Sequence, residues 1–277
     1  MIKKALLMLI LCLYISCNSS ENEEQEPGAV NPPNEEVVRF KDGFEGVYNP
    51  DPSNLAYNVW YQSHRGESTV KPTSEIQART GEKCLAVNLV ANENGLSRSE
   101  IGVNLRNSLG DYWYGFSIFI PSEYDISKMV LDRDNFVTVL AQWGVWENNP
   151  GLPDFALRLG REDGQNKFFL TYEPSTKLEY LWDAPLIQGE WVDWVIHIKW
   201  AKDNTGLIEV WQNKNLVFSK YNFQSTDGDG SEVKSKIGLY YSSWGDRTRG
   251  YNEIKVYYDN YTIGKGEDMF DLVDPGK

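Results

Sequence analysis

Hydrophobic and polar residues alternate over many short stretches of this chain, a pattern typical of β-strands. In the clearest stretch, Trp191–Trp200, every second residue from Val192 to Trp200 is apolar, and Asp193, His197 and Lys199 lie between them. A period of two with one apolar face predicts a strand that is buried on one side. The same pattern predicts further strands at Lys83–Leu89, Tyr112–Ile120, Phe136–Trp143, Phe155–Leu159, Lys167–Tyr172, Leu207–Gln212, Lys236–Tyr241 and Lys255–Ile263.

Turn signals separate these stretches, and no long helical period or internal repeat is present in the sequence. Clusters of Asp, Asn and Gly at 203–206, 213–215 and 227–230 are typical of turns. Many strands without intervening helices predict an all-β fold, and for this length a two-sheet β-jelly roll, a concanavalin-like sandwich. We expect residues 39–277 to form one such domain.

The first residues indicate export. Lys3 and Lys4 precede an apolar run that is too short to span a bilayer, and the run ends at Leu-Tyr-Ile-Ser before Cys17. This ending resembles a bacterial lipobox, which predicts a signal peptide over residues 1–17 and lipidation of Cys17. The alternative is an ordinary secretory signal in which Cys17 is incidental. Residues 18–38 are acidic and contain prolines, which predicts a flexible linker. We therefore expect an extracytoplasmic outer-membrane lipoprotein of a Gram-negative bacterium, held at the cell surface or in the periplasm.

Composition excludes several classes of function. Asp and Glu number 40 against 27 Lys and Arg, and the net charge of -13 argues against a general nucleic-acid binder. The chain has only 2 His and 3 Cys, too few for a multi-histidine zinc centre or a cysteine-ligated cluster. Cys84 stands in an apolar stretch and is expected to be a buried thiol without a disulfide partner.

Common catalytic motifs are also absent from the sequence. It has no phosphate-binding Gly-rich loop, no Gly-x-Ser-x-Gly elbow and no His-Glu-x-x-His. A jelly-roll glycoside hydrolase would need two carboxylates projecting from one strand, and no predicted strand carries such a pair. The acidic turn at 227–230 lacks the spacing of a calcium-binding loop.

Several segments, taken in order, resemble the jelly-roll polysaccharide lyases of the heparin lyase I and glucuronan lyase type. The resemblance extends over most of residues 39–265, and the matching segments are Tyr112–Pro121, Leu140–Trp143, Gly189–Trp200, Gly206–Trp211, Lys236–Tyr240 and Tyr257–Gly264. It implies β-elimination on a uronic-acid-containing polysaccharide such as glucuronan, ulvan, alginate or a heparin-type polymer. It also implies 4,5-unsaturated uronate ends in the product.

Such an elimination requires neutralisation of the uronate carboxylate, removal of the C5 proton and protonation of the leaving oxygen. Arg98 and Glu100 alternate on one face of their stretch, so that Glu100 could hold the guanidinium while it binds a uronate. Gln142 lies among apolar residues and could donate to the same carboxylate.

Lys236 and Tyr240 are the strongest candidates for proton transfer. Four residues apart in a strand, they share a face, and Gly238 between them would leave space for a sugar. An ammonium near a phenol favours the phenolate, which can accept a proton and later return it. The resemblance assigns catalysis to this Lys and Tyr. The alternative, two solvent-exposed sheet residues, is the usual outcome for an arbitrary Lys-x-x-x-Tyr.

One departure from the family pattern concerns a histidine. Members of the heparin lyase I type carry His directly after Gln-Trp, whereas this chain has Gly144 after Trp143. Tyr240 would then perform both proton transfers, or His64 would enter from the stretch 61–65, or the protein would bind sugar without cleaving it. His197, in the middle of its strand, is expected to be structural.

Further substrate contacts are expected from Glu100, Trp143, Arg158 and His64, and the loop with Arg247 and Arg249 could add cations. Relatives bind calcium, which makes Glu45 and Asp259 candidate ligands of a structural calcium ion. The alternative is two surface carboxylates near strand ends. We expect a monomeric polysaccharide lyase. The main alternative is a non-catalytic carbohydrate-binding surface lipoprotein with the same fold.

Overall fold

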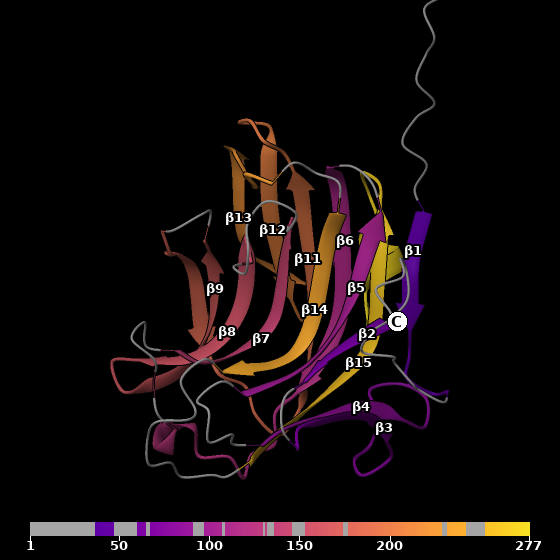
Figure 1. Ribbon diagram of the computed structural model, residues 1–277, viewed down its shortest axis with the longest axis vertical. Helices are drawn as coiled ribbons and strands as arrows, with labels where there is room; N and C mark the ends of the chain where they lie inside the picture. The colour runs from indigo at the N-terminus through magenta and orange to yellow at the C-terminus, as the bar shows by residue number, and fades with distance from the viewer. Residues whose placement is uncertain are drawn as a thin grey trace, which may run out of the picture. The chain divides into compact units, whose positions relative to one another are not determined.

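The computed structural model describes residues 37–46, 60–64, 67–90, 97–106, 109–129, 131, 136–145, 153–173, 177–228, 232–241 and 253–277. These residues form two antiparallel sheets that pack face to face, as the jelly-roll prediction requires (Figure 1). Two short helical turns accompany them, a 3-10 turn at Ile126–Lys128 and α1 at Phe270–Val273.

Sheet A has the strand order β13-β12-β11-β6-β15-β4-β3, and β1 also pairs with β15. Its strands are β1 (Val37–Asp42), β3 (Thr69–Thr73), β4 (Cys84–Val90), β6 (Gly110–Phe119), β11 (Trp191–Trp200), β12 (Gly206–Gln212), β13 (Asn215–Phe223) and β15 (Glu253–Lys265). The first and last strands of the described chain are therefore neighbours. The central strand β6 pairs with β11 and β15, both far away in sequence.

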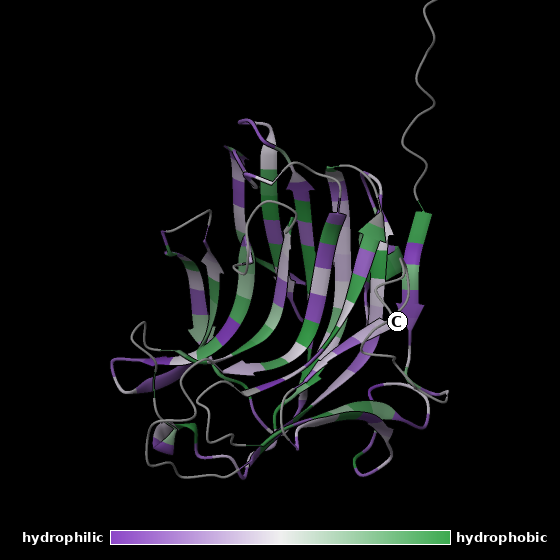
Figure 2. Cartoon of the chain, in the orientation of Figure 1, coloured by the Kyte–Doolittle hydropathy of each residue, from purple (hydrophilic) through white to green (hydrophobic). Residues whose placement is uncertain are grey.

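Sheet B has the strand order β10-β9-β8-β7-β14-β5-β2. Its strands are β2 (Trp60–His64), β5 (Ser97–Arg106), β7 (Phe136–Val145), β8 (Phe155–Glu162), β9 (Gln165–Tyr172), β10 (Glu179–Pro185) and β14 (Glu232–Tyr241). Figure 2 shows hydrophobic and hydrophilic residues alternating along β14, which lies between β7 and β5 in Figure 1. Such alternation gives the sheet one face toward sheet A and one outer face.

The core lies between the two sheets and is rich in aromatic side chains. Trp143 of β7, Trp194 of β11 and Tyr114 of β6 are fully buried there. The alternation predicted for β11 is confirmed, because every second residue from Val192 to Trp200 belongs to this core. Cys84 is a buried free thiol, as expected, and burial raises its pKa to about 12.

A second, smaller apolar layer covers the outer face of sheet A. Trp113 and Val195 lie on that face and pack against Met269 and Val273 of the C-terminal segment. Gly115 permits this contact, since a Cβ there would lie 1.7 Å from the Val273 carbonyl oxygen. The sequence pattern of β11 therefore has two apolar faces at this point.

Candidate active site

The register of sheet B brings predicted residues of three strands together on its outer face. Lys236 of β14 lies between Gly102 of β5 and Gln142 of β7. Four residues further along β14, Tyr240 lies opposite Arg98. Residues that are paired across antiparallel strands project from the same face. The candidate site is therefore a polar surface on the side of sheet B that faces away from the core.

Glu100 is the buried centre of this surface. Its side chain is 1% exposed, and its Oε1 accepts a hydrogen bond from Nε2 of Gln142. Nε of Arg98 lies 3.1 Å from Oε2 of the same carboxylate. A buried carboxylate with two such partners fixes the position of both side chains. Glu100 therefore acts through Arg98 and Gln142, whose remaining N–H groups can face a ligand.

The Arg98 guanidinium is held by a ring as well as by a carboxylate. Its central carbon lies 4.4 Å from the centre of the Tyr240 ring, a cation–π geometry. Its Nη1 donates to Oγ of Ser63 over 3.4 Å. The side chain remains 25% exposed, so a substrate carboxylate can reach it. The pairing predicted for Arg98 and Glu100 is present, and Tyr240 joins it.

Lys236 is held in a largely buried position beside these groups. Burial lowers its pKa from the ordinary value, the negative charge of Glu100 opposes this change, and Arg98 and Lys234 reinforce it. A buried amine with a lowered pKa exchanges protons more readily than a surface lysine. Its place in the register, two rows from Tyr240 on the same face, is the one predicted from the spacing.

Tyr61 of β2 is a site residue that the sequence reading did not single out. It pairs with Gly102, and a Cβ on Gly102 would lie 2.5 Å from Cζ and from the hydroxyl of Tyr61. The Tyr61 ring therefore lies over Gly102, next to Lys236 in the register. Burial and the charge of Glu100 raise the pKa of Tyr61, so its hydroxyl stays a hydrogen-bond donor. No spacing within β2 or β5 indicates this contact, because it crosses between two strands.

Gly238 has a different role from the one expected. Its φ of 131° lies in the region that favours glycine, and a Cβ would lie 2.4 Å from the carbonyl oxygen of Ser99. The pairing of β14 with β7 also shifts between Ile237 and Tyr240, which marks a bulge. The glycine therefore permits close approach of the β5 backbone and a local bend, rather than leaving space for a sugar.

Arg158 lies on the same face, further along the sheet. It is opposite Val139, which pairs with Tyr240 on its other side. Its Nε donates to Oγ1 of Thr171 over 2.9 Å, and its Nη2 lies 3.4 Å from Glu173. Arg158 is therefore a largely buried cation with fixed partners, three strands away from Arg98, and β7 and β14 lie between them.

Two predicted substrate contacts are not brought to this surface. Trp143 is fully buried between the sheets, where its ring packs against Tyr114 and Phe116. The alternation of β7 turns Gln142 outward and Trp143 inward, so the indole has no access to a ligand. His64 is exposed at the end of β2 and pairs with Ser99, whose hydroxyl donates to Thr69 of sheet A. This register turns His64 away from the face that holds Arg98.

His197 lies on the other sheet, in the structural role expected for it. Its Nδ1 is 2.9 Å from Glu209, its Nε2 is 3.1 Å from Asp111, and its ring stacks on Trp113 with centroids 3.9 Å apart. It takes no part in the surface on sheet B.

Backbone covers position 144, where members of the heparin lyase I type carry histidine. Gly144 lies on the outer face of β7 opposite Lys234, and a Cβ there would lie 3.0 Å from the backbone nitrogen of Asp154 and 3.4 Å from Cα of Pro153. Asp154 is fixed in turn, because Oδ2 accepts from the Val145 amide and from Thr226. A side chain at 144 would have to displace this segment, which explains the glycine.

The carboxylates proposed for calcium are already bound to amides. Glu45 accepts from the backbone nitrogens of Glu82 and Lys83, and buried Asp259 accepts from those of Arg79, Thr80 and Asn260. Burial raises the pKa of Asp259 to about 6. Within the described ranges, no group of three or more His, Cys, Asp or Glu side chains is placed to hold a metal. These oxygens do not fit a cation site as they stand, and calcium stays a prediction.

Some predictions fall on residues outside the described part of the chain. They are the signal peptide and Cys17, the linker up to residue 36, and the Arg247 and Arg249 loop. Strand β1 begins at Val37, two residues before the expected domain start. Among the helices of the described residues, none has the length and apolar character to cross a membrane.

Comparison with known proteins gives the family. A family model described as polysaccharide lyase matches residues 56–262, most of the described domain. The chain belongs to the polysaccharide lyase family. No curated protein sequence matches this lyase at a significant level. It is therefore an enzyme that acts on polysaccharides, and the fold and the family agree.

Solved structures show how widely the fold of this lyase recurs. An endo-β-1,4-glucuronan lyase from the fungus Trichoderma reesei matches with a TM-score of 0.63 and 21% identity over 80% of this chain and 100% of that chain. A variant of the alginate lyase Aly36B in complex with an alginate tetrasaccharide has a TM-score of 0.50 and 13% identity, over 77% and 100%. The globular domain of T. cruzi calreticulin has a TM-score of 0.51 and 11% identity, over 86% and 90%. At these identities the likeness shows the fold alone.

Proposed function

We propose that this lyase cleaves a uronic-acid-containing polysaccharide by β-elimination on the outer face of sheet B. The observation that carries the proposal is the unit formed by Arg98, Glu100 and Gln142 directly beside Lys236 and Tyr240. Carboxylate recognition and proton transfer thereby meet on one surface, as this reaction requires.

The first role in the mechanism is neutralisation of the uronate carboxylate. The exposed part of the Arg98 guanidinium and the second N–H of the Gln142 amide are donors fixed by Glu100. Charge that develops on the carboxylate as the C5 proton leaves is stabilised by these fixed donors, which lowers the barrier. Arg158 supplies a further cation for a neighbouring sugar unit of the polymer.

The second role is proton transfer. Tyr240, with its hydroxyl ionised, accepts the proton from C5, and the electron pair of that C–H bond forms the C4–C5 double bond while the bond from C4 to the leaving oxygen breaks. The phenol then returns the proton to the leaving oxygen, which restores the starting state of Tyr240. Lys236 lies on the same face of β14 and contributes a further polar group to the surface that would hold the sugar.

Support for a uronate polymer comes from the site and from similar structures. The surface holds two arginines and a lysine in an acidic protein, an arrangement suited to an anionic ligand. Two of the similar structures are a glucuronan lyase and an alginate lyase with bound alginate. Glucuronan and alginate are therefore the first substrates to test, with ulvan and heparin-type polymers beside them.

For the location of the enzyme, we propose an outer-membrane lipoprotein anchored at Cys17. The signal-like segment and its Ser-Cys ending support this, and so does the acidic, Pro-containing stretch that follows it. Metabolic labelling with a radioactive fatty acid should mark the chain, and Cys17→Ser should abolish the label. A secreted, unlabelled chain would support the ordinary signal peptide instead.

Ultraviolet absorbance at about 235 nm, where 4,5-unsaturated uronates absorb, tests the proposed reaction. The full chain is incubated with glucuronan, alginate, ulvan and a heparin-type polymer. A rise on one polymer establishes elimination and identifies the substrate. A flat trace on every polymer that the chain retains in affinity gels would overturn the proposal in favour of carbohydrate binding without cleavage.

A further inference from the structure

A hollow of about 730 Å³ lies on the outer face of sheet A, on the side of the sandwich away from the candidate active site. The segment 76–79, the end of β6, the start of β11 and the turn at 213–214 line it. Its volume is within the range of small-molecule sites, about 300–1,000 Å³. None of the residues assigned to catalysis contributes to it.

An aromatic wall bounds the hollow. Trp191 is half-buried, and its Nε1 donates to the carbonyl oxygen of Gln77 over 3.1 Å, which fixes the indole plane. Phe119 packs beside it with ring centroids 5.6 Å apart, and Tyr257 lies behind Phe119 at 6.1 Å. The indole therefore has a supported position and an accessible part, as an aromatic platform for a sugar needs.

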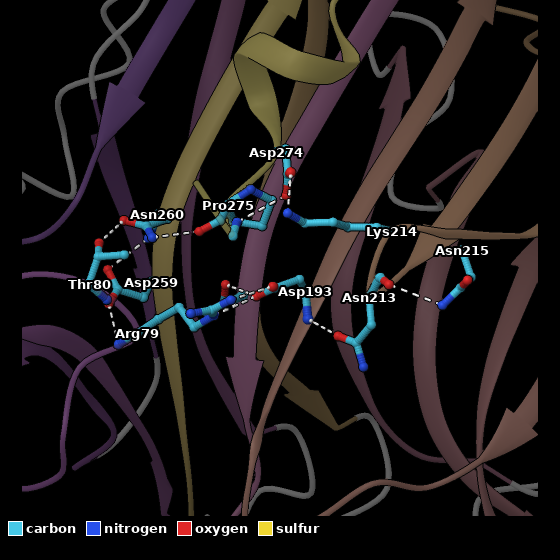
Figure 3. A network of polar contacts seen from close by, with 12 residues as sticks. Arg79, Thr80, Asp193, Asn213, Lys214, Asn215, Asp259, Asn260, Asp274 and Pro275 are labelled. Carbon is cyan, nitrogen blue, oxygen red and sulfur yellow. Dashed lines mark hydrogen bonds and ion pairs between the residues drawn. The ribbon is translucent and has the colours of Figure 1, made fainter.

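The floor is a fixed polar cluster around Asp193. Arg79 donates to both carboxylate oxygens over 3.0 and 2.9 Å, and Ser117 donates to one of them over 2.7 Å. Figure 3 shows Arg79 on one side of Asp193 and Asn213 on the other. The contacts of Arg79 with Asp193 use Nε and Nη2, so Nη1 is available to a ligand. Donor and acceptor groups are thus held in place before anything binds.

The turn between β12 and β13 closes the opposite side. Oδ1 of Asn213 accepts from the Asp193 amide over 2.9 Å, and the Asn213 amide donates back to the Asp193 carbonyl over 2.8 Å. Asn213 and Lys214 have φ of 49° and 67°, the values of a tight hairpin turn. Lys214 is 54% exposed and lies 3.2 Å from Asp274. Its charge is therefore present at the rim and partly balanced.

We propose that this hollow is a second carbohydrate-binding site, which holds a short stretch of polysaccharide against the Trp191 ring. Apolar faces of pyranose rings stack on aromatic side chains, and sugar hydroxyls use donors and acceptors such as Arg79 and Asn213. Each cation of the hollow has a carboxylate partner, so the site recognises ring and hydroxyl chemistry, with at most one extra contact to a uronate. The domain would thereby hold polymer on both faces of the sandwich, whether or not sheet B cleaves it.

Fluorine NMR of the full chain labelled with 5-fluorotryptophan gives a local test. The resonance that disappears in Trp191→Phe is assigned to Trp191. Titration with oligosaccharides from glucuronan, alginate and a neutral β-glucan should shift this resonance in a saturable way for at least one of them. A Trp191 resonance that stays unchanged while the same sugars saturate other signals would overturn the proposal. This readout is independent of any absorbance change at about 235 nm.

Retention in polysaccharide affinity gels gives the second test. Trp191→Ala should weaken binding about tenfold, the change that loss of roughly 1.4 kcal/mol of stacking produces. Trp211→Ala is the matched control, because Trp211 is a half-buried indole on the same face but outside the hollow. Lys214→Gly removes the charge at the rim and keeps the turn. It should weaken retention of a uronate polymer and leave retention of a neutral polymer unchanged, which shows which kind of sugar is bound. Equal retention of wild type and Trp191→Ala, or equal losses in both tryptophan variants, would contradict the site.

Discussion

Arg98 and Tyr240 lie opposite each other on neighbouring strands, with the guanidinium 4.4 Å from the centre of the phenol ring. In the proposed mechanism, this contact joins the group that neutralises a carboxylate to the group that moves a proton. A substrate carboxylate bound by Arg98 would thus be positioned next to the Tyr240 hydroxyl. In an elimination, the carboxylate and the acidic C5 proton belong to the same sugar, so this proximity is what the chemistry needs.

Tyr240→Phe should reduce turnover by about 100-fold or more, the usual contribution of general acid–base catalysis. The ring and its contact with Arg98 remain, so retention in affinity gels and thermal stability should stay near wild type. Turnover is measured by absorbance on the polymer that wild type cleaves. Tyr180→Phe, an exposed tyrosine of β10 on the same sheet, is the control. Near-normal turnover in Tyr240→Phe would remove this residue from the mechanism.

Arg98→Ala should lower kcat/KM by roughly 30-fold on polymers with free carboxylates, the value of about 2 kcal/mol for a charged hydrogen bond. On methyl-esterified polymer the loss should be much smaller, because the ester carries no charge. Arg98→Lys keeps the charge but not the planar fork of the guanidinium. Its kcat/KM on the free polymer should therefore lie between those of wild type and Arg98→Ala. If esterified and free substrates lose equally, Arg98 does not bind the carboxylate.

Gly102→Ala should displace Tyr61, because the new Cβ would lie 2.5 Å from the Tyr61 hydroxyl and ring. We expect a loss of stability of about 2 kcal/mol and a lower turnover, since the ring lies beside Lys236. Gly46→Ala is the matched control, because nothing lies within 4 Å of a Cβ at that position. Tyr61→Phe separates the hydroxyl from the ring: a change in kcat with KM preserved would make the hydroxyl a positioning group. Unchanged melting of Gly102→Ala would show that Tyr61 moves freely.

Gly144→His tests whether the family's histidine can be restored. The side chain would have to move the backbone at Asp154, so we expect a loss of about 1–3 kcal/mol in stability and no gain in turnover. Gly144→Ala should show part of the same loss, because its Cβ alone lies 3.0 Å from the Asp154 nitrogen. Higher turnover in Gly144→His would contradict this expectation, if the pH profile of turnover also gained a step near the ordinary pKa of histidine. It would show that the backbone at Asp154 can move to admit the side chain.

Asp154 should make the fold less stable as pH rises. Burial raises its pKa to about 7, with a smaller contribution from Asp227, while the Val145 amide and Thr226 act in the opposite direction. The folded chain therefore holds a proton that the unfolded chain has lost, and the free energy of unfolding falls by about 1 kcal/mol per pH unit between about 5 and 7. Asp154→Asn should flatten this slope in urea unfolding, whereas Asp163→Asn, an exposed turn residue, should not. If the free energy of unfolding of Asp154→Asn depends on pH as steeply as that of wild type, Asp154 is not the group responsible.

Alternation along the chain was sufficient to predict the jelly roll and most of its buried strands. β11 was recognisable because apolar residues fall at every second position from Val192 to Trp200. Polar or exposed residues weaken the apolar pattern of the strands that were not predicted, which are β1, β2, β3, β5, β10 and β13. β5 matters most among them, because it carries Arg98 and Glu100.

The candidate site was predictable only in part, for a reason that lies in register. Spacing within one strand placed Lys236 and Tyr240 on a common face, and it placed Arg98 with Glu100. Spacing cannot show that Gln142 lies beside Lys236, or that Tyr61 covers Gly102, because those contacts cross between strands. Trp143 is a different case, because adjacent residues of a strand face opposite sides, and an outward Gln142 already requires an inward Trp143.

The pairing of β1 with β15 also has a consequence for how this chain folds. Sheet A cannot close until the C-terminal strand exists, because β15 separates β1 and β4 from β6. Contacts between segments so distant in sequence make folding slow, on a scale of about milliseconds to seconds. A nascent chain that ends before residue 253 would lack the strand that unites both halves of this sheet. The domain is therefore expected to remain unfolded during synthesis and to fold in one late, cooperative step.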